Sequence, residues 1–322
     1  MRPADRRPKA LATGDEAPTR LLRHRAASFG EREPGCEEPA RTPRAFNTPM
    51  HTDPLPATAT LGRAMPRSRL ATSLVVIASF LIVNAIGLDP FRAVAGHLEG
   101  WPRMLALAAL GYGLYLLVPL GIAAAWFGRK RALASLGLAA PPWPALALAA
   151  GCSAIVLAWI AATSTPIPLD RLALELVRQA LLPGIAEEVL FRAFLFGFLY
   201  RHAGWGFLPA ALLSAAVFGL EHVYQGGDAM QAAGIALLTG IGGVWWSWLF
   251  VEWRWNLWVP IAFHVLLNAY WTAFDVADDA VGPAMSVILR LACIALSVAV
   301  TVLIARRRGG LRVTGRRWIR GP

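Results

Sequence analysis

Long apolar runs, each close to the length of a membrane span, constrain this chain more than any other feature. Eight of them follow one another, at about 70–88, 103–127, 144–164, 184–200, 206–224, 230–251, 256–273 and 284–305. A helix needs about 20 apolar residues to cross the hydrocarbon core, and it satisfies its own backbone hydrogen bonds there. The runs therefore predict an all-α fold, a polytopic membrane helical bundle with about eight transmembrane helices over residues 70–305.

The first 69 residues have a different composition. They hold 13 of the 31 Lys and Arg residues, 8 of the 20 Asp and Glu residues and 10 of the 23 prolines, without sustained apolar periodicity. Such a segment buries too little apolar surface to fold, so we expect residues 1–69 to be a disordered, basic, proline-rich tail. Met50 and Met65 are alternative starts, and a start at Met65 would leave most of this tail outside the protein.

The net charge of +11 would suit a nucleic-acid-binding protein, but the positions of the basic residues argue against one. They lie in the terminal tails and in short loops such as Arg129-Lys130-Arg131. Cytoplasmic loops of membrane proteins carry such an excess, which also meets anionic lipid. We expect membrane lipid and no nucleic acid as partners. The chain should lie in the cell inner membrane with both termini cytoplasmic, including the basic tail 306–322.

Two segments are predicted to lie at the membrane–water interface. Residues 170–182 place Arg171, Glu175 and Arg178 among leucines, which predicts an amphipathic interfacial helix leading through Pro183-Gly184 into the fourth run. Tryptophans also cluster around the turn between the sixth and seventh runs, where they predict an aromatic belt. They are Trp245, Trp246, Trp248, Trp253, Trp255 and Trp258.

Ionisable side chains stand inside apolar runs, where each is costly and asks for an explanation. In the run 184–200, Glu188 and Arg192 are one helical turn apart and should form an ion pair. Glu187 points about 100° away around the helix, so that arginine leaves it unpaired. An unpaired carboxylate in an apolar surrounding is suited to act as a general base. The alternative is a pair of ionic contacts that only pins helices together.

Two further motifs carry histidines. His222 shares a helix face with Phe218, and His264 shares one with Asn268. Intramembrane histidines often only bond one helix to another, but two donors such as His264 and Asn268 can also stabilise an oxyanion. With Glu187, these groups supply the parts for activating water. No serine or cysteine has a nearby base in an equivalent setting, which disfavours covalent catalysis.

At these residues the chain resembles the CAAX-protease and bacteriocin-processing (CPBP, or Abi) family of intramembrane peptidases. That family includes the type II CAAX prenyl endopeptidases. Its pattern of EExxxR, FxxxH and HxxxN, on separate transmembrane helices, is matched within about residues 175–275, which would form the catalytic core. The resemblance implies an intramembrane endopeptidase that hydrolyses a peptide or protein substrate.

The resemblance also implies a role for each matched residue. Glu187 would activate water, and His222 would hold that water. His264 and Asn268 would form the oxyanion site, while the ion pair of the first motif would order its helix. The catalytic residues implied are thus Glu187, Glu188, Arg192, His222, His264 and Asn268.

The sequence leaves metal dependence open. Family members are commonly described as metallopeptidases, and two His with one Glu could hold zinc with one open position. The compact HExxH arrangement is absent, and a His–Asn pair suits an oxyanion better than a cation. A metal-free glutamate mechanism is therefore favoured, with no cofactor certain and a divalent zinc ion as the alternative.

Other functions and the direction of substrate entry also stay open. A non-catalytic scaffold or bacteriocin-immunity protein of the same family would use the motif residues for packing. A small-solute transporter is disfavoured, because the runs show no repeat and no paired broken helices. The expected topology places Glu187 and His222 in the extracytoplasmic half, whereas a CAAX-type protease would receive its substrate from the cytosol. Neither prenylation of the substrate nor the oligomeric state follows from the sequence.

Overall fold

A computed structural model describes residues 68–87, 89–277 and 281–322. The chain divides into two compact units, Met1–Met50 and His51–Pro322, and every described residue belongs to the second unit. The predicted tail, including Met50 and Met65, lies outside the described residues except for Ser68 and Arg69. Ser68 caps the first helix by accepting a hydrogen bond from the backbone N–H of Ala71.

The predicted all-α class is confirmed for the described residues, which contain helices and a single isolated β-bridge between Trp205 and Arg320. Three π-helical segments interrupt the α-helices: η1 (Ala108–Tyr112), η3 (Val177–Leu181) and η4 (Glu188–Phe196). The α-helices are α1 (Arg69–Ile86), α2 (Asp89–Val94), α3 (Gly100–Leu107), α4 (Gly113–Phe127), α5 (Ala132–Ser135), α6 (Trp143–Thr163), α7 (Leu169–Leu176), α8 (Leu182–Glu187), α9 (Gly197–Arg201), α10 (Phe207–Leu220), α11 (Ala229–Glu252), α12 (Trp258–Ala273) and α13 (Ala284–Arg307).

Six helical stretches within the described ranges are long and apolar enough to cross a membrane, so the chain is a multi-pass membrane protein. They are Arg69–Ile86, Gly100–Phe127, Trp143–Thr163, Phe207–Gln225, Ala229–Glu252 and Ala284–Arg307. The predicted number of eight is not confirmed. The run 256–273 gives α12, whose 16 residues reach only about 24 Å. The run 184–200 is helical but carries three ionisable side chains, Glu187, Glu188 and Arg192.

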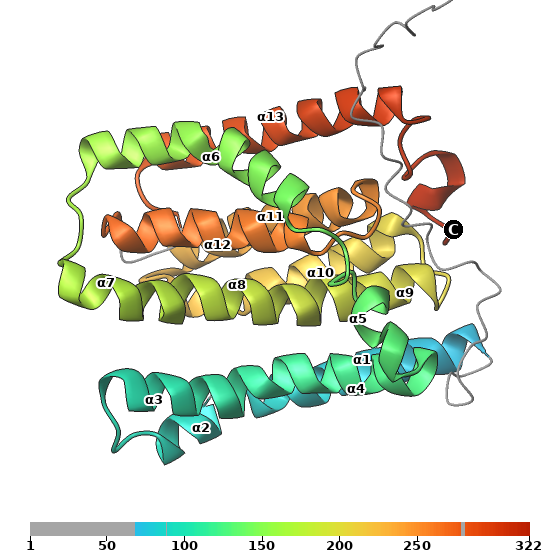
Figure 1. The fold of residues 1–322 in the computed structure, drawn as a ribbon, viewed down its shortest axis with the longest axis horizontal. Coiled ribbons are helices and arrows are strands. Elements are labelled where there is room, and N and C mark those ends of the chain that lie inside the picture. The colour runs from blue at the N-terminus through green and yellow to red at the C-terminus, as the bar shows by residue number, and fades with distance from the viewer. Residues whose placement is uncertain (1–67, 88, 278–280) are drawn as a thin grey trace, which may run out of the picture. The chain divides into compact units, whose positions relative to one another are not determined.

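One helix without interruption, residues 169–201, passes through the middle of this unit. It joins α7, η3, α8, η4 and α9 end to end, and Figure 1 shows α7, α8 and α9 in one line between α4 and α12. The helix predicted over 170–182 is present and runs on into the fourth apolar run. Its place at the membrane–water interface stays a prediction. Pro183 stands two residues after the end of η3, and the register shift of that wider π-helical turn lets the helix continue without the amide hydrogen that proline lacks.

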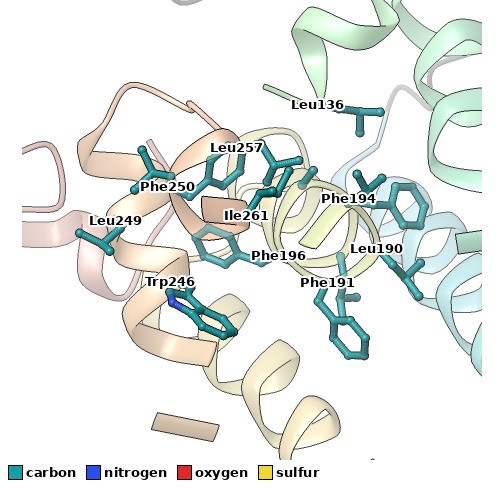
Figure 2. Close-up of a cluster of buried hydrophobic side chains, with 14 of the residues drawn as sticks. Leu136, Leu190, Phe191, Phe194, Phe196, Trp246, Leu249, Phe250, Leu257 and Ile261 are labelled. Atoms are coloured by element: carbon teal, nitrogen blue, oxygen red, sulfur yellow. The ribbon is translucent and has the colours of Figure 1, made fainter. Parts of the chain in front are cut away.

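The segment η4 lies at the centre of the buried core. It packs against α1, α4, α10 and α11, and all of its residues are buried. Figure 2 shows large side chains leaving this segment in several directions, among them Leu190, Phe191 and Phe194, with Trp246 and Phe250 of α11 nearby. A helix that is apolar on all sides belongs in an interior. The exceptions in η4 are Glu188 and Arg192, both 0% exposed.

The predicted aromatic belt is wrong for two of its six tryptophans. Trp245 and Trp246 are buried on the inner faces of α11. The indole Nε1 of Trp245 donates to Ser297 Oγ on α13 at 2.9 Å, and the ring of Trp246 stacks on His264. Their positions follow from helix packing, which buries these two side chains against α12 and α13.

Two glycines allow the motif-bearing helices to approach closely. A Cβ atom at Gly184 of α8 would lie 2.6 Å from Val265 Cγ2, next to His264 on α12. One at Gly219 of α10 would lie 2.4 Å from the backbone oxygen of Ala236 on α11. Small residues permit such approaches between membrane helices, and here they flank the first, second and third motifs.

We predict that Gly219→Ala destabilises the protein by about 1–3 kcal/mol, because a backbone oxygen cannot move aside without shifting α11. Gly151→Ala is the matched control: a Cβ there meets nothing within 4 Å, and alanine favours a helix by up to about 1 kcal/mol. Unfolding midpoints in detergent micelles should fall for the first variant and hold or rise for the second. Equal midpoints would contradict the close approach.

Candidate active site

The carboxylate of Glu188 joins the first and third motifs. Its Oε1 lies 3.2 Å from Arg192 Nη1, which is the ion pair predicted from their spacing. The same oxygen lies 2.8 Å from Nδ1 of His264 on α12. An Nδ1–H that donates to a carboxylate fixes both the tautomer and the orientation of an imidazole. Glu188 therefore holds His264 in place as well as compensating Arg192.

His264 is fixed on its ring face and at its Nδ1 edge. The indole of Trp246 stacks on the imidazole, with 4.7 Å between centroids and 21° between planes. Phe218 meets the ring edge to face at 6.2 Å. Because Nδ1 is bound to Glu188, the free nitrogen is Nε2, which lies 3.8 Å from Glu187 Oε2. That separation is too long for a direct hydrogen bond.

The guanidinium of Arg192 is held by aromatic rings as well as by charge. Its Cζ lies 4.1 Å from the centroid of Phe218 and 5.1 Å from that of Trp246. None of its three nitrogens has a hydrogen-bond partner among the described residues. Desolvated cation–π contacts can contribute about 2 kcal/mol. Phe218 thereby bridges motif one and motif two, a role that its place in the sequence pattern did not reveal.

Four of the predicted site residues line one cavity of about 380 Å³. They come from three helical segments: Glu187 from α8, His222 after α10, and His264 with Asn268 from α12. The size falls in the range of small-ligand pockets. Glu188 and Arg192 are not part of the lining and support it from behind.

The two remaining polar groups already have partners on the protein. His222 Nδ1 lies 2.7 Å from the backbone oxygen of Phe218, one turn back on its own helix. The side-chain amide of Asn268 donates to the backbone oxygen of Gln179 at 3.1 Å. The second amide hydrogen of Asn268 and the Nε2 edge of His222 are left for a substrate or water.

Sequence reasoning missed Trp246, which touches both His264 and Arg192. Its indole Nε1 is buried without a hydrogen-bond partner among the described residues, so packing against these two groups accounts for its position. One signal was present in the sequence: Trp246 lies well inside a run of α11 and not at its end. A membrane-belt tryptophan should lie at the interface.

The described side chains of the site offer no complete set of metal ligands. In the described part of the chain, no group of three or more His, Cys, Asp and Glu side chains is arranged to hold one. Oε1 of Glu188 is shared by Arg192 and His264 Nδ1. The predicted alternative of a three-ligand zinc site does not fit this arrangement.

We predict that Glu188→Gln destabilises the protein by about 3–5 kcal/mol, because it leaves the buried Arg192 cation without its counter-charge. The double variant Glu188→Gln/Arg192→Leu should recover much of this loss. Glu175→Gln is the matched control on the same helix, since its partner Arg178 is 55% exposed; it should change stability by less than about 1 kcal/mol. Denaturant unfolding in micelles measures all three. A Glu188→Gln effect as small as that of Glu175→Gln would contradict the buried pair.

Comparison with known proteins finds matches to the region that carries the three motifs. Residues 170–270 match the family profile of type II CAAX prenyl endopeptidase Rce1-like proteins. The Bacillus subtilis protein named "Putative membrane peptidase YdiL" is 26% identical over 102 residues, which is 32% of this chain and 37% of that protein. The match thus spans little more than a third of the curated relative. No solved structure matches the chain. Residues 170–270, which carry all three motifs, are a domain of the Rce1-like type II CAAX prenyl endopeptidase (CPBP) family.

Proposed function

We propose that this protein is an intramembrane endopeptidase that hydrolyses a peptide bond with water activated by Glu187. The observation that carries the proposal is the meeting of Glu187, His222, His264 and Asn268 at one cavity, although they come from three helical segments. The family of residues 170–270 supports a peptidase acting on a protein or peptide.

In the proposed reaction, one water molecule sits between Glu187 Oε2 and His264 Nε2, whose 3.8 Å separation lets a single water contact both. Glu187 takes a proton from this water, and the oxygen forms a bond to the carbonyl carbon of the scissile peptide. The side-chain amide of Asn268 donates to the resulting oxyanion. His222 can add a donor from Nε2 only in its imidazolium form, because its Nδ1–H is held by the backbone oxygen of Phe218. The carbon–nitrogen bond then breaks as the proton held by Glu187 passes to the leaving amine.

This assignment differs in one respect from the roles that the family resemblance implied. His264 was expected in the oxyanion site and His222 at the water. Because Nδ1 of His264 is bound to Glu188 and its Nε2 faces Glu187, we place His264 beside the water. His222 stands on another helix of the cavity, where it is better placed to meet the carbonyl oxygen.

We predict that Glu187→Gln lowers kcat/KM by at least about 100-fold, because the amide keeps the shape but cannot accept the proton of water. His264→Ala should be similarly impaired. Cleavage of a fluorogenic peptide in proteoliposomes measures both, with Glu175→Gln as the carboxylate control.

Folding of these variants is checked by their unfolding midpoints. Retained turnover in both Glu187→Gln and His264→Ala would remove the mechanism. A cellular phenotype that survives Glu187→Gln would point instead to the non-catalytic scaffold or immunity protein.

We also propose a topology. One end of the unit gathers basic side chains: Arg201 donates to the backbone oxygen of Ser135 at 2.9 Å and stacks over Trp255. Arg129 to Arg131 follow α4 at this end. The active-site cavity lies toward the other end of the unit. Its lining includes Gln225, which follows the C-terminal end of α10, and Thr272, near the C-terminal end of α12. By the positive-inside rule the basic end is cytoplasmic, so substrate would enter from the other side.

Single cysteines test this topology in a Cys36→Ser background, where the remaining Cys152 and Cys293 are buried. We predict that Gly227→Cys, beside the cavity, reacts with a membrane-impermeant maleimide in intact spheroplasts. Lys130→Cys should react only after permeabilisation. The reverse pattern would put the cavity on the cytoplasmic side and overturn the proposed direction of substrate entry. It would leave the proposed catalytic mechanism unaffected.

A further inference from the structure

A second cavity lies beside the active-site cavity, in a groove between α10, α11 and α13. Its volume is about 540 Å³. Small residues form its base, with Ala215 and Ala216 of α10 facing Gly240 of α11. Its lining is almost wholly apolar, and on α11 it runs from Ala236 to Trp248, a length of about 18 Å at the rise of an α-helix.

An aromatic wall closes one end of this groove. Trp318 of the segment η6 (Gly315–Trp318) lines it together with Phe207, and their rings meet edge to face at 5.3 Å. This is the end at which α10 begins and at which the basic residues gather. An apolar channel that runs along membrane helices and ends at the level of an interface has the shape of one lipid tail beneath its headgroup.

The C-terminal segment that carries Trp318 is anchored to the helices. The carboxylate of Glu252 accepts hydrogen bonds from the backbone N–H groups of Arg312 and Val313, both at 2.9 Å. Further along, the N–H of Gly321 donates to the backbone oxygen of Gly204 at 3.1 Å. These bonds fix the segment against the end of the groove.

The charge of this segment identifies the headgroup. Residues 306–322 contain seven arginines and no acidic residue. Arg316 and Arg317 stand next to Trp318, and both are exposed. Basic side chains close to the membrane surface attract anionic lipid headgroups.

From these observations we propose that the groove between α10, α11 and α13 binds one anionic phospholipid. An acyl chain would lie on Gly240 and its neighbours, and the phosphate would meet Arg316 and Arg317. The site is independent of the proposed peptidase function, although the groove and the active-site cavity share Trp245 and Ile294 as a common wall.

Native mass spectrometry of the full chain tests the site, with phosphatidylglycerol and phosphatidylcholine of the same acyl chains as probes. Wild-type protein should retain phosphatidylglycerol in preference to phosphatidylcholine. Arg316→Gln/Arg317→Gln should weaken phosphatidylglycerol binding by about 30-fold, from the loss of two basic contacts. Gly240→Leu, which fills the groove, should abolish the preference.

Gly234→Leu is the matched control, since Gly234 lies on the same helix outside the groove and has space for a side chain. Equal retention of the two lipids by wild-type protein would overturn the proposal. So would binding unchanged by both Gly240→Leu and the double arginine variant, or a dimer that Gly240→Leu dissociates, since a second copy would then fill the groove. The exposed arginine variant keeps the test valid if Gly240→Leu fails to fold.

Discussion

The Glu188 carboxylate, buried between a cation and an imidazole, is the interaction on which the site depends. Burial of an ionised group in a membrane protein is costly unless it is paired. Here one oxygen meets Arg192 at 3.2 Å and His264 at 2.8 Å. The pair therefore does more than neutralise itself, because it sets the position of an imidazole on another helix. Glu187, the next residue back, is left to face the cavity.

The backbone around this pair is shaped to bring it to the centre. The segment η4 begins at Glu188 and is π-helical through Phe196, a form that is common at functional sites. Its remaining side chains are apolar and fill the core on every side. The low polarity of that surrounding strengthens each electrostatic contact within it. Close helix approaches at Gly184 and Gly219 then bring α12 and α11 to the motifs.

Local contacts of the site could be predicted from the sequence, whereas those between helices could not. The pairing of Glu188 with Arg192, and the outward turn of Glu187, follow from the helical repeat alone. The bond from Glu188 to His264 joins residues 76 positions apart, and it depends on how α8, η4 and α12 pack. The same holds for Trp246, whose burial depends on the rotation of α11 and not on its own identity.

The fold class and the membrane spans could likewise be predicted from the sequence only in part. Apolar runs of the right length predicted six of the helices as spans that the structure supports. The remaining two runs were judged by apolarity without regard to their surroundings, although one is short and the other is enclosed by neighbouring helices. The continuity of the helix through Pro183 could not be predicted from the sequence, because it depends on a π-helical turn that ends two residues before the proline.

The central claim is that Glu187 and His264 act on the same water molecule. A double-mutant cycle of kcat/KM with Glu187→Gln, His264→Ala and the double variant measures this directly. Groups that act as a unit are strongly non-additive, so the double variant should be no slower than the slower single variant. Losses that multiply would mean that the two side chains act independently and would contradict the shared water.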